Sequence, residues 1–340
     1  MTTRRNSKRA SGEVIRPTLG AVLMQSAQTD ADPTSTNANE NYAFVINVAS
    51  IGAEALTLAP GHTLRRATPE EMAVIKKWLE HNPSDWGPFA PCATWECSWP
   101  ATSGKIEQLP ESEWRYFVIA FRGTNTTLLD IQTAADLATV EPEIGFEVLA
   151  PYGFVVQAPG RYQQAFAARI TPGWFLQITE ENANEIAAIC VQIQQAAGAP
   201  IDSKGVARRV GDLKNLSSRS PFRFLGYFAI LESVLTHVPK PTDPYDSITR
   251  QIKGKLALLD NRWSPKIDYS PFSGAAAETV WTKMYAYRSV LAHGGTPDFK
   301  RELALLRDHA QAYRLIKETV KAVVRQTLIE PQLLSDLREC

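Results

Sequence analysis

The stretch 275–295, AAAETVWTKMYAYRSVLAHGG, is typical of an apolar helix that stops at two glycines. It places Arg288 five positions before His293, and Gly294 and Gly295 follow directly. This spacing alone is weak evidence for a site, because a solvated arginine and a histidine at the C-cap would give the same pattern. Two interpretations therefore follow: a plain helix end, or a pair of catalytic groups.

The neighbouring stretches show the same helical period. Apolar side chains recur every three or four positions, and loops with Pro or Gly separate the segments. One segment begins with Thr179 and acidic residues, as the first turn of a helix does. No convincing strand pattern interrupts the series. An all-helical bundle is therefore predicted over residues 179–340, with helices in 179–198, 221–239, 246–261, 275–295 and 296–330.

Residues 41–178 have a different pattern. A helix is predicted in 68–82, where Thr68 is the N-cap and Glu71 completes a capping box. Short β-branched and aromatic runs bounded by turn residues predict strands in 42–50, 114–124 and 145–157. The expected fold class is an α+β N-terminal domain followed by an all-α helical bundle.

The remaining composition limits the class of protein. Residues 1–40 are rich in Ser, Thr, Asn and Asp without an apolar period, so a disordered tail is expected. The sequence contains no run of 18 apolar residues, so we expect no membrane partner. The four cysteines and five histidines show no metal-ligand spacing. We therefore expect no metal and no cofactor, free thiols, and a cytoplasmic location.

The net charge of zero hides an asymmetry between the two ends of the chain. Residues 201–340 hold 22 Lys and Arg against 15 Asp and Glu, a net of +7, so residues 1–200 carry a net of −7. A basic region suits a polyanion such as nucleic acid. The alternative is that the two regions attract each other.

The arrangement RSVLAHG at 288–294 resembles the R-x4-6-H motif of HEPN domains, in particular of the Apea-like HEPN family. The stretch RFLGYFAILESVL at 223–235, which contains Glu232, resembles the helix upstream of the motif in that family. The resemblance covers about residues 180–335, and a mixed α+β segment ahead of the helices also fits. One position departs from the pattern, because Ser289 stands where many catalytic members have asparagine.

This resemblance implies a metal-independent endoribonuclease that acts in anti-phage abortive infection or as a toxin. The implied partners are RNA, with tRNA or another structured RNA as substrate, and a second copy of the chain bound through the HEPN domain. The residue 41–178 domain would sense an unknown trigger and regulate the nuclease. The implied catalytic residues are Arg288, His293 and Ser289, with supporting roles for Glu232, Tyr285 and Gly294.

The residue types suit that reaction. Cleavage without metal uses the 2′-OH of the RNA as nucleophile, so one proton must leave that hydroxyl and another must reach the departing 5′-oxygen. Histidine suits the proton steps, and the guanidinium of arginine suits the phosphorane oxygens. Five positions on an ideal helix separate Arg288 and His293 by about 140°. We therefore expect the two glycines to redirect the histidine, or a symmetric partner chain to supply the second group.

Several alternatives stay open. A HEPN module without activity would bind RNA, a nucleotide or a partner protein, or would serve as a dimerising scaffold. Glu232 is expected either in the active site or in a structural ion pair with Arg288 or Arg250. His237 and His309 are expected at surface or cap positions.

The helix from Ala275 to His293 is the expected contact element of a dimer. Trp281, Met284 and Tyr285 are its candidate apolar anchors. A bundle core could use the same three side chains, so this pattern does not decide between the two roles.

Overall fold

The computed structural model describes residues 40–81, 93–98, 105–122, 127–149, 153–156, 175–196, 198–239, 242 and 246–340. All of these belong to one compact unit that spans Asn39–Cys340. Apart from Glu40, the tail predicted at 1–40 lies outside the described residues.

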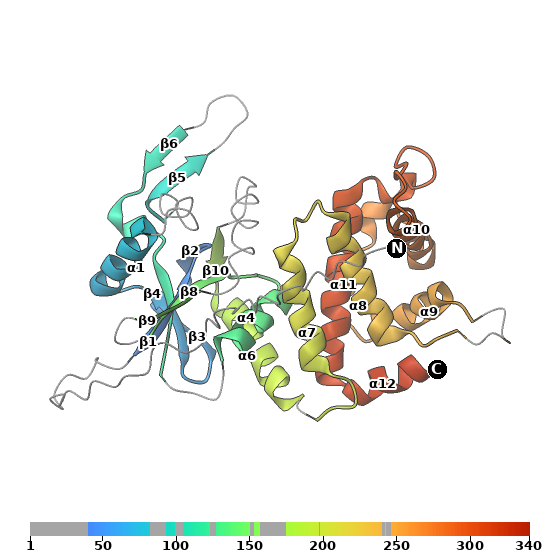
Figure 1. Ribbon diagram of the computed structural model, residues 1–340, viewed down its shortest axis with the longest axis horizontal. Coiled ribbons are helices and arrows are strands. Elements are labelled where there is room, and N and C mark those ends of the chain that lie inside the picture. The colour runs from blue at the N-terminus through green and yellow to red at the C-terminus, as the bar shows by residue number, and fades with distance from the viewer. Residues whose placement is uncertain are drawn as a thin grey trace, which may run out of the picture. The chain divides into compact units, whose positions relative to one another are not determined.

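Strands fill the N-terminal region and helices fill the C-terminal region, as Figure 1 shows, so the predicted fold class is confirmed. The strands are β1 (Asn41–Val45), β2 (Val48–Ile51), β3 (Ala55–Ala59), β4 (His62–Arg66), β5 (Trp95–Ser98), β6 (Lys105–Gln108), β7 (Phe117–Phe121), β8 (Ile144–Leu149), β9 (Gly153–Val156) and β10 (Leu176–Ile178). The helices among them are α1 (Pro69–His81), α4 (Leu128–Leu137) and α6 (Glu180–Gln195). The later helices are α7 (Ser203–Asp212), α8 (Pro221–Leu235), α9 (Ile248–Asp260), α10 (Ala277–Ala292), α11 (His309–Ile329) and α12 (Pro331–Glu339), with short 3₁₀ turns η2 (Leu213–Asn215) and η4 (Ala304–Leu306).

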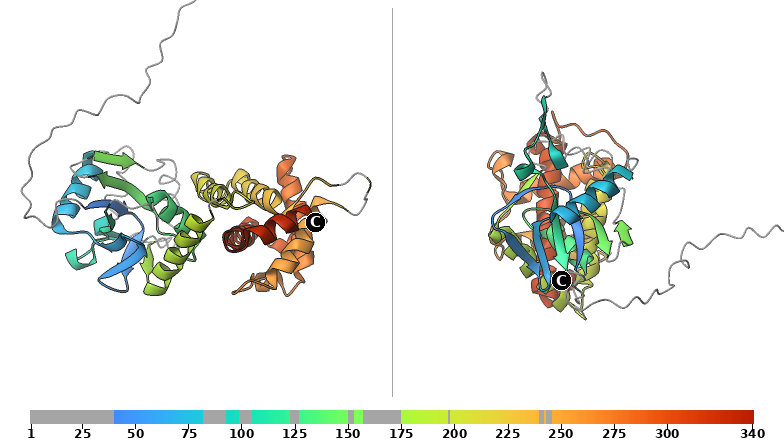
Figure 2. Two further views of the ribbon diagram at one scale, coloured as in Figure 1. Left: turned by 90° about the horizontal axis from the view of Figure 1, so that it is seen from below. Right: turned by 90° about the vertical axis from the view of Figure 1, so that its left-hand side faces the viewer.

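Six antiparallel strands form the main sheet in the order β3-β4-β7-β1-β8-β9. In the central strand β1, Phe44 stands opposite Val118 of β7 and Phe146 of β8. Successive side chains of a strand point to opposite faces, so Phe44 belongs to the core beneath α1, whereas Ala43 and Val45 belong to the core shared with α4 and α6. Helices therefore cover both faces of the sheet, an arrangement that the two further views in Figure 2 also show.

The run 42–50, predicted as one strand, is divided into β1 and β2, which belong to different sheets. The division falls at Asn47, whose buried side chain serves the loop before β8. Its Nδ2 donates to the carbonyl of Glu141 at 3.1 Å, and its Oδ1 accepts the backbone N–H of Glu143 at 2.8 Å. A polar residue that must satisfy a distant loop in this way ends the regular pairing of β1.

The predicted starts of α1 at Thr68 and of α6 at Thr179 are both confirmed by their caps. The Thr68 hydroxyl accepts the N–H of Glu71, whose carboxylate accepts the N–H of Thr68, which completes the capping box of α1. At α6, Thr179 and Asn182 form the same reciprocal pair of bonds. Each cap satisfies backbone donors that the first helical turn leaves without a partner.

In the helical region, α11 packs against α7, α8 and α12, and α8 packs against α9 and α10. The stripe predicted on α8 faces the core, because Phe224, Phe228, Leu231 and Leu235 are all buried. Helix α6 packs against β3 and α4 and also contacts α11, and one apolar cluster runs from the strands into the bundle. The domain boundary at 178/179 stays a prediction.

Candidate functional site

Helix α10 ends in a Schellman motif directly after the Arg288–His293 stretch. His293 is the C-cap, Gly294 follows with φ +69°, and the Gly294 N–H donates to the carbonyl of Leu291 at 3.1 Å. The Gly295 N–H reaches back to the carbonyl of Val290 at 2.8 Å. These two bonds satisfy carbonyls at the helix end, and the left-handed residue between them explains the glycine.

The histidine is not redirected as expected. His293 has φ −94° and ψ 8°, close to helical values, and the left-handed turn begins only after it, at Gly294. The glycines therefore change the course of the chain beyond the histidine. Because the backbone stays near-helical through both residues, Arg288 and His293 keep roughly the 140° separation of a regular helix.

Arg288 forms an ion pair with Glu232 of α8, one of the two partners expected for that carboxylate. Its Nη2 lies 3.2 Å from Glu232 Oε1 and 3.3 Å from Oε2. Tyr285 contributes its hydroxyl, 3.5 Å from Glu232 Oε1, and its ring, whose centre lies 5.6 Å from the guanidinium carbon. Burial, and next the negative charge of Glu232, raise the pKa of Tyr285, so its hydroxyl remains a donor. The α8–α10 contact thus fixes the arginine from two directions.

The guanidinium of Arg288 keeps unused hydrogen-bonding capacity. Only Nη2 bonds to a described residue, and the buried Nε has no partner. The side chain is 30% exposed. Arginine presents five N–H donors in a planar fork, so Nη1 is left to bind an acceptor from solvent while Glu232 holds the opposite side.

His293 and Ser289 are held only through their backbones. The side chain of His293 is exposed, and neither the imidazole nor the Ser289 hydroxyl bonds to another described residue. The exposed imidazole lies at the C-terminal end of the helix, the negative end of its dipole. The pair therefore consists of a positioned arginine and an unrestrained histidine on one helix end.

Two of the three candidate dimer anchors are buried in the chain's own core. Trp281 and Met284 are 3% and 0% exposed, and the Trp281 indole N–H donates to the Tyr269 hydroxyl at 2.9 Å. Tyr285 is half-buried against α8. The core role, and not the dimer role, accounts for Trp281 and Met284.

The histidines expected at surface or cap positions instead join separate elements. The Tyr287 hydroxyl lies 2.7 Å from His309 Nδ1, and His309 Nε2 lies 2.9 Å from the carbonyl of Ser218. This chain of bonds connects α10, the first residue of α11 and the loop before α8. Burial raises the pKa of Tyr287 to about 12, which keeps its hydroxyl protonated. His237 likewise bonds to Asp246 at 3.1 Å and to the carbonyl of Arg338 at 3.1 Å.

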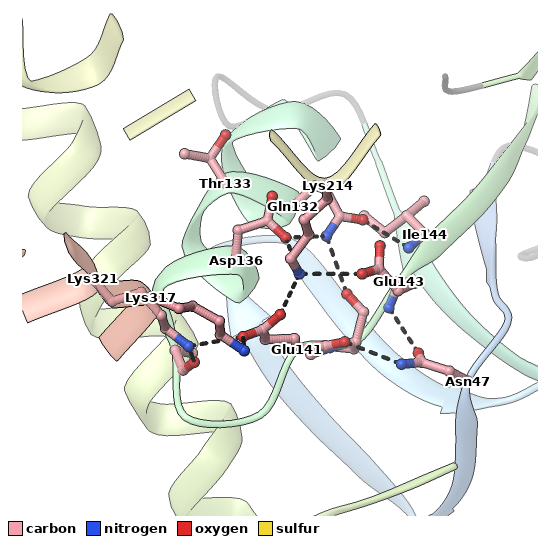
Figure 3. Close-up of polar contacts among 12 residues, drawn as sticks. Asn47, Gln132, Thr133, Asp136, Glu141, Glu143, Ile144, Lys214, Lys317 and Lys321 are labelled. Carbon is pink, nitrogen blue, oxygen red and sulfur yellow. Dashed lines mark hydrogen bonds and ion pairs between the residues drawn. The ribbon is translucent and has the colours of Figure 1, made fainter. Parts of the chain in front are cut away.

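Sequence reasoning missed a cluster of six charges between the two regions of the chain, drawn in Figure 3. Glu141, in the loop between α4 and β8, faces Lys317 at 2.7 Å and Lys321 at 2.9 Å, both on α11. Lys214 of η2 lies 2.5 Å from Glu141, and it also pairs with Asp136 at 2.7 Å and Glu143 at 3.2 Å. Three carboxylates from the acidic region thus meet three lysines from the basic region.

Two smaller contacts repeat this pattern. Asp130 of α4, only 4% exposed, pairs with Lys204 of α7 at 2.9 Å and with Arg208 at 3.5 Å. Glu185 of α6 pairs with Arg325 of α11 at 2.7 Å. With the cluster around Glu141, six basic residues of 201–340 are thus bonded to acids of the other region. The sequence signal for this contact was the opposite net charge of residues 1–200 and 201–340. The ion pairs agree with the alternative that these two regions attract each other.

The described residues contain no group of three or more His, Cys, Asp and Glu side chains that could hold a metal ion. Cys190 and Cys340, the cysteines whose side chains are described, are free thiols. None of the helices within the described ranges is both long and apolar enough to cross a membrane. Comparison of the chain with protein-family models, with curated proteins and with solved structures gave no match.

Proposed function

We propose that the protein is a metal-independent endoribonuclease whose site lies at the C-terminal end of α10. One observation carries the proposal. Arg288 is fixed by Glu232 through Nη2 alone, so its Nη1 can bind a phosphate, and an exposed imidazole, His293, lies five positions later at the end of the same helix. The resemblance of RSVLAHG to the HEPN motif supports the same assignment and suggests a role in anti-phage defence.

In the proposed reaction the RNA supplies its own nucleophile. The 2′-OH loses a proton, its oxygen bonds to the adjacent phosphorus, and the bond from phosphorus to the 5′-oxygen breaks as that oxygen gains a proton. Arg288 stabilises the extra negative charge on the phosphorane, and Glu232 and Tyr285 keep the guanidinium oriented. His293 carries one proton step. Ser289, one position after the arginine, is a further donor for the phosphate.

The test is cleavage of total RNA by the purified chain in EDTA. Arg288→Ala and His293→Ala should each abolish cleavage and leave the circular dichroism spectrum unchanged, and the products should end in 2′,3′-cyclic phosphate. Arg262→Ala is the matched control for the arginine, because Arg262 also forms an ion pair, at 3.1 Å from Glu330. His81→Ala is the control for the histidine, because His81 is exposed at the end of α1. Cleavage that survives in His293→Ala, or that requires added metal, would overturn the proposal.

A second candidate, a module without activity that binds a partner protein, is favoured by a different observation. Glu232 already neutralises Arg288, and six other cations of the basic region are bonded to acids within the chain. Such a module would retain little RNA on a filter even at low salt, because cations bonded to acids are not available for phosphate contacts. It would leave the RNA intact in the same reaction that tests the nuclease.

A further inference from the structure

We infer that the cluster of Asp136, Glu141, Glu143, Lys214, Lys317 and Lys321 is an electrostatic latch. It fixes α11 against the N-terminal region and thereby sets the position of α10, the helix that carries the candidate site. The six formal charges cancel within the cluster, and Figure 3 shows how the lysines converge on the three carboxylates. The role of α10 as the carrier of a site rests on the proposed function, whereas the latch does not depend on it.

Side chains from two elements, Gln132 of α4 and Asn47 after β1, hold the segment that carries the acidic residues of the latch. Gln132 Nε2 donates to Asp136 at 3.3 Å and to the carbonyl of Pro142 at 3.1 Å, and Gln132 Oε1 accepts the N–H of Ile144 at 2.8 Å. Asn47 bonds to the backbone of the same loop from the turn after β1. Asp136 and the backbone of the loop that carries Glu141 and Glu143 are thus held by α4 and the sheet.

Two of the three lysines belong to a helix that also touches α10. Lys317 and Lys321 lie on α11, and Lys321 also donates to the carbonyl of Ala138 at 2.5 Å. The first residue of the same helix, His309, bonds to Tyr287, the neighbour of Arg288. From His309 to Lys321 the helix rises about 18 Å, at ~1.5 Å per residue. One rigid element therefore joins the latch to the motif helix.

Because the cluster is buried, the loss of a single charge from it should destabilise the contact. The side chains of Asp136, Lys214 and Lys321 are 2%, 7% and 6% exposed, so none of them can turn into water without local opening. A surface pair in such a position would contribute little, but a buried pair that loses one partner leaves an uncompensated charge. Neutralising one member should therefore loosen the contact, and neutralising an opposite member as well should restore part of it.

The test is hydrogen–deuterium exchange of the full chain, measured on peptides from α4–β8, α11 and α10. Glu141→Gln leaves three lysines against two carboxylates, and exchange in these three regions should accelerate at least tenfold. Glu141→Gln/Lys321→Gln restores the charge balance and removes the buried lysine that pairs with Glu141, so it should recover much of the protection. Glu278→Gln is the matched control, because Glu278 pairs with Lys253 on the surface and is 76% exposed; its exchange should stay unchanged.

Peptides from α1 separate local from global effects, because α1 packs on the opposite face of the sheet and in a separate apolar cluster. The inference is overturned if α1 accelerates as much as α11, or if α10 and α11 stay within twofold of the wild type. A double variant that is looser than either single variant would also overturn it. If Glu141→Gln does not fold, Lys317→Gln takes its place, because Lys317 is 26% exposed and its loss should accelerate the same peptides several-fold.

Discussion

At the scale of single residues, Glu141 combines a side chain that is only 19% exposed with three cationic neighbours. Burial alone would raise the pKa of its carboxyl, but Lys214, Lys317 and Lys321 outweigh burial and hold that pKa well below its usual value of 4.5. A carboxyl whose folded pKa is depressed stabilises the fold fully above its unfolded pKa. That stabilisation is lost as the pH falls through the folded pKa.

The first prediction concerns this acid sensitivity. The midpoint of urea unfolding should fall steadily once the pH drops below about 4.3, the pKa of an unfolded glutamate. Glu141→Gln should be less stable at pH 7 but should lose less further stability between pH 5 and pH 3, because a glutamine does not titrate. Parallel curves for the variant and the wild type would contradict the assignment of the acid sensitivity to Glu141.

Tyr287 offers a second test at this scale, since its hydroxyl is the connection between α10 and His309. Tyr287→Phe keeps the buried ring and removes one hydrogen bond, so the free energy of unfolding should fall by about 1 kcal/mol. Tyr285→Phe is the control, because the hydroxyl of Tyr285 lies 3.5 Å from Glu232, a longer contact than the 2.7 Å bond of Tyr287. Urea denaturation of both variants measures the difference. Equal losses would show that the Tyr287 bond contributes nothing specific.

At the scale of elements, the end of α10 is set by backbone geometry. An added Cβ at Gly294 would meet nothing within 4 Å, but the residue has φ +69°, which costs an L-residue about 1 kcal/mol. Gly254 also has open space around it but lies inside α9, where alanine favours the helix by about 0.8–1 kcal/mol.

The third prediction is therefore a pair of identical substitutions with opposite effects. Gly294→Ala should lower the free energy of unfolding by about 1 kcal/mol, and Gly254→Ala should raise it by nearly as much. Thermal unfolding of both variants measures the two signs. A Gly294→Ala variant as stable as the wild type would mean that the Schellman turn contributes no strain.

The elements also show where sequence reasoning succeeds and where it ends. The helices α6, α8 and α9 were predicted because each buries one stripe and exposes the other side. Helix α4 was missed, because almost all of its residues are buried and its sequence LLDIQTAADL has no polar face to set a period. The hairpin of β3 and β4 was also missed, although its residues alternate between the two faces.

Among the charged contacts, too, one could be predicted from the sequence and another could not. Arg288 was one of the two partners expected for Glu232, because both residues lie on apolar helices. The Glu141 cluster could not be predicted, because partners such as Glu141 and Lys321 lie 180 residues apart and are ordinary in their local sequence. Charge totals reveal that two regions differ, but only the tertiary fold decides which charges meet.

At the scale of the whole molecule, the proposed site requires groups that one helix separates by about 140°. A homodimer can bring Arg288 of one chain to His293 of the other, and such a composite site would use each chain twice. Trp281 and Met284 are buried within the chain, so a dimer must be built on other residues.

The fourth prediction is a mixing experiment on the same nuclease assay. Arg288→Ala and His293→Ala chains, each inactive alone, should regain about a quarter of the wild-type rate when mixed, because half of the random dimers hold one intact composite site. Light scattering should show a dimer at micromolar concentration. A monomer that cleaves RNA would contradict the composite site, and a dimer whose mixed chains stay inactive would place both groups in one chain.

The order of synthesis gives the charged contact a further consequence. All six strands of the main sheet are encoded before residue 157, whereas Lys321 follows Glu141 by 180 residues. At about 5–20 residues per second, a nascent chain would wait roughly 9–36 s between the two. During that interval the carboxylates of the loop before β8 stay hydrated, while the strands of the sheet can already pair. Lys214 follows on η2, and Lys317 and Lys321 arrive last, on α11, so ribosomal timing separates folding of the sheet from completion of the contact.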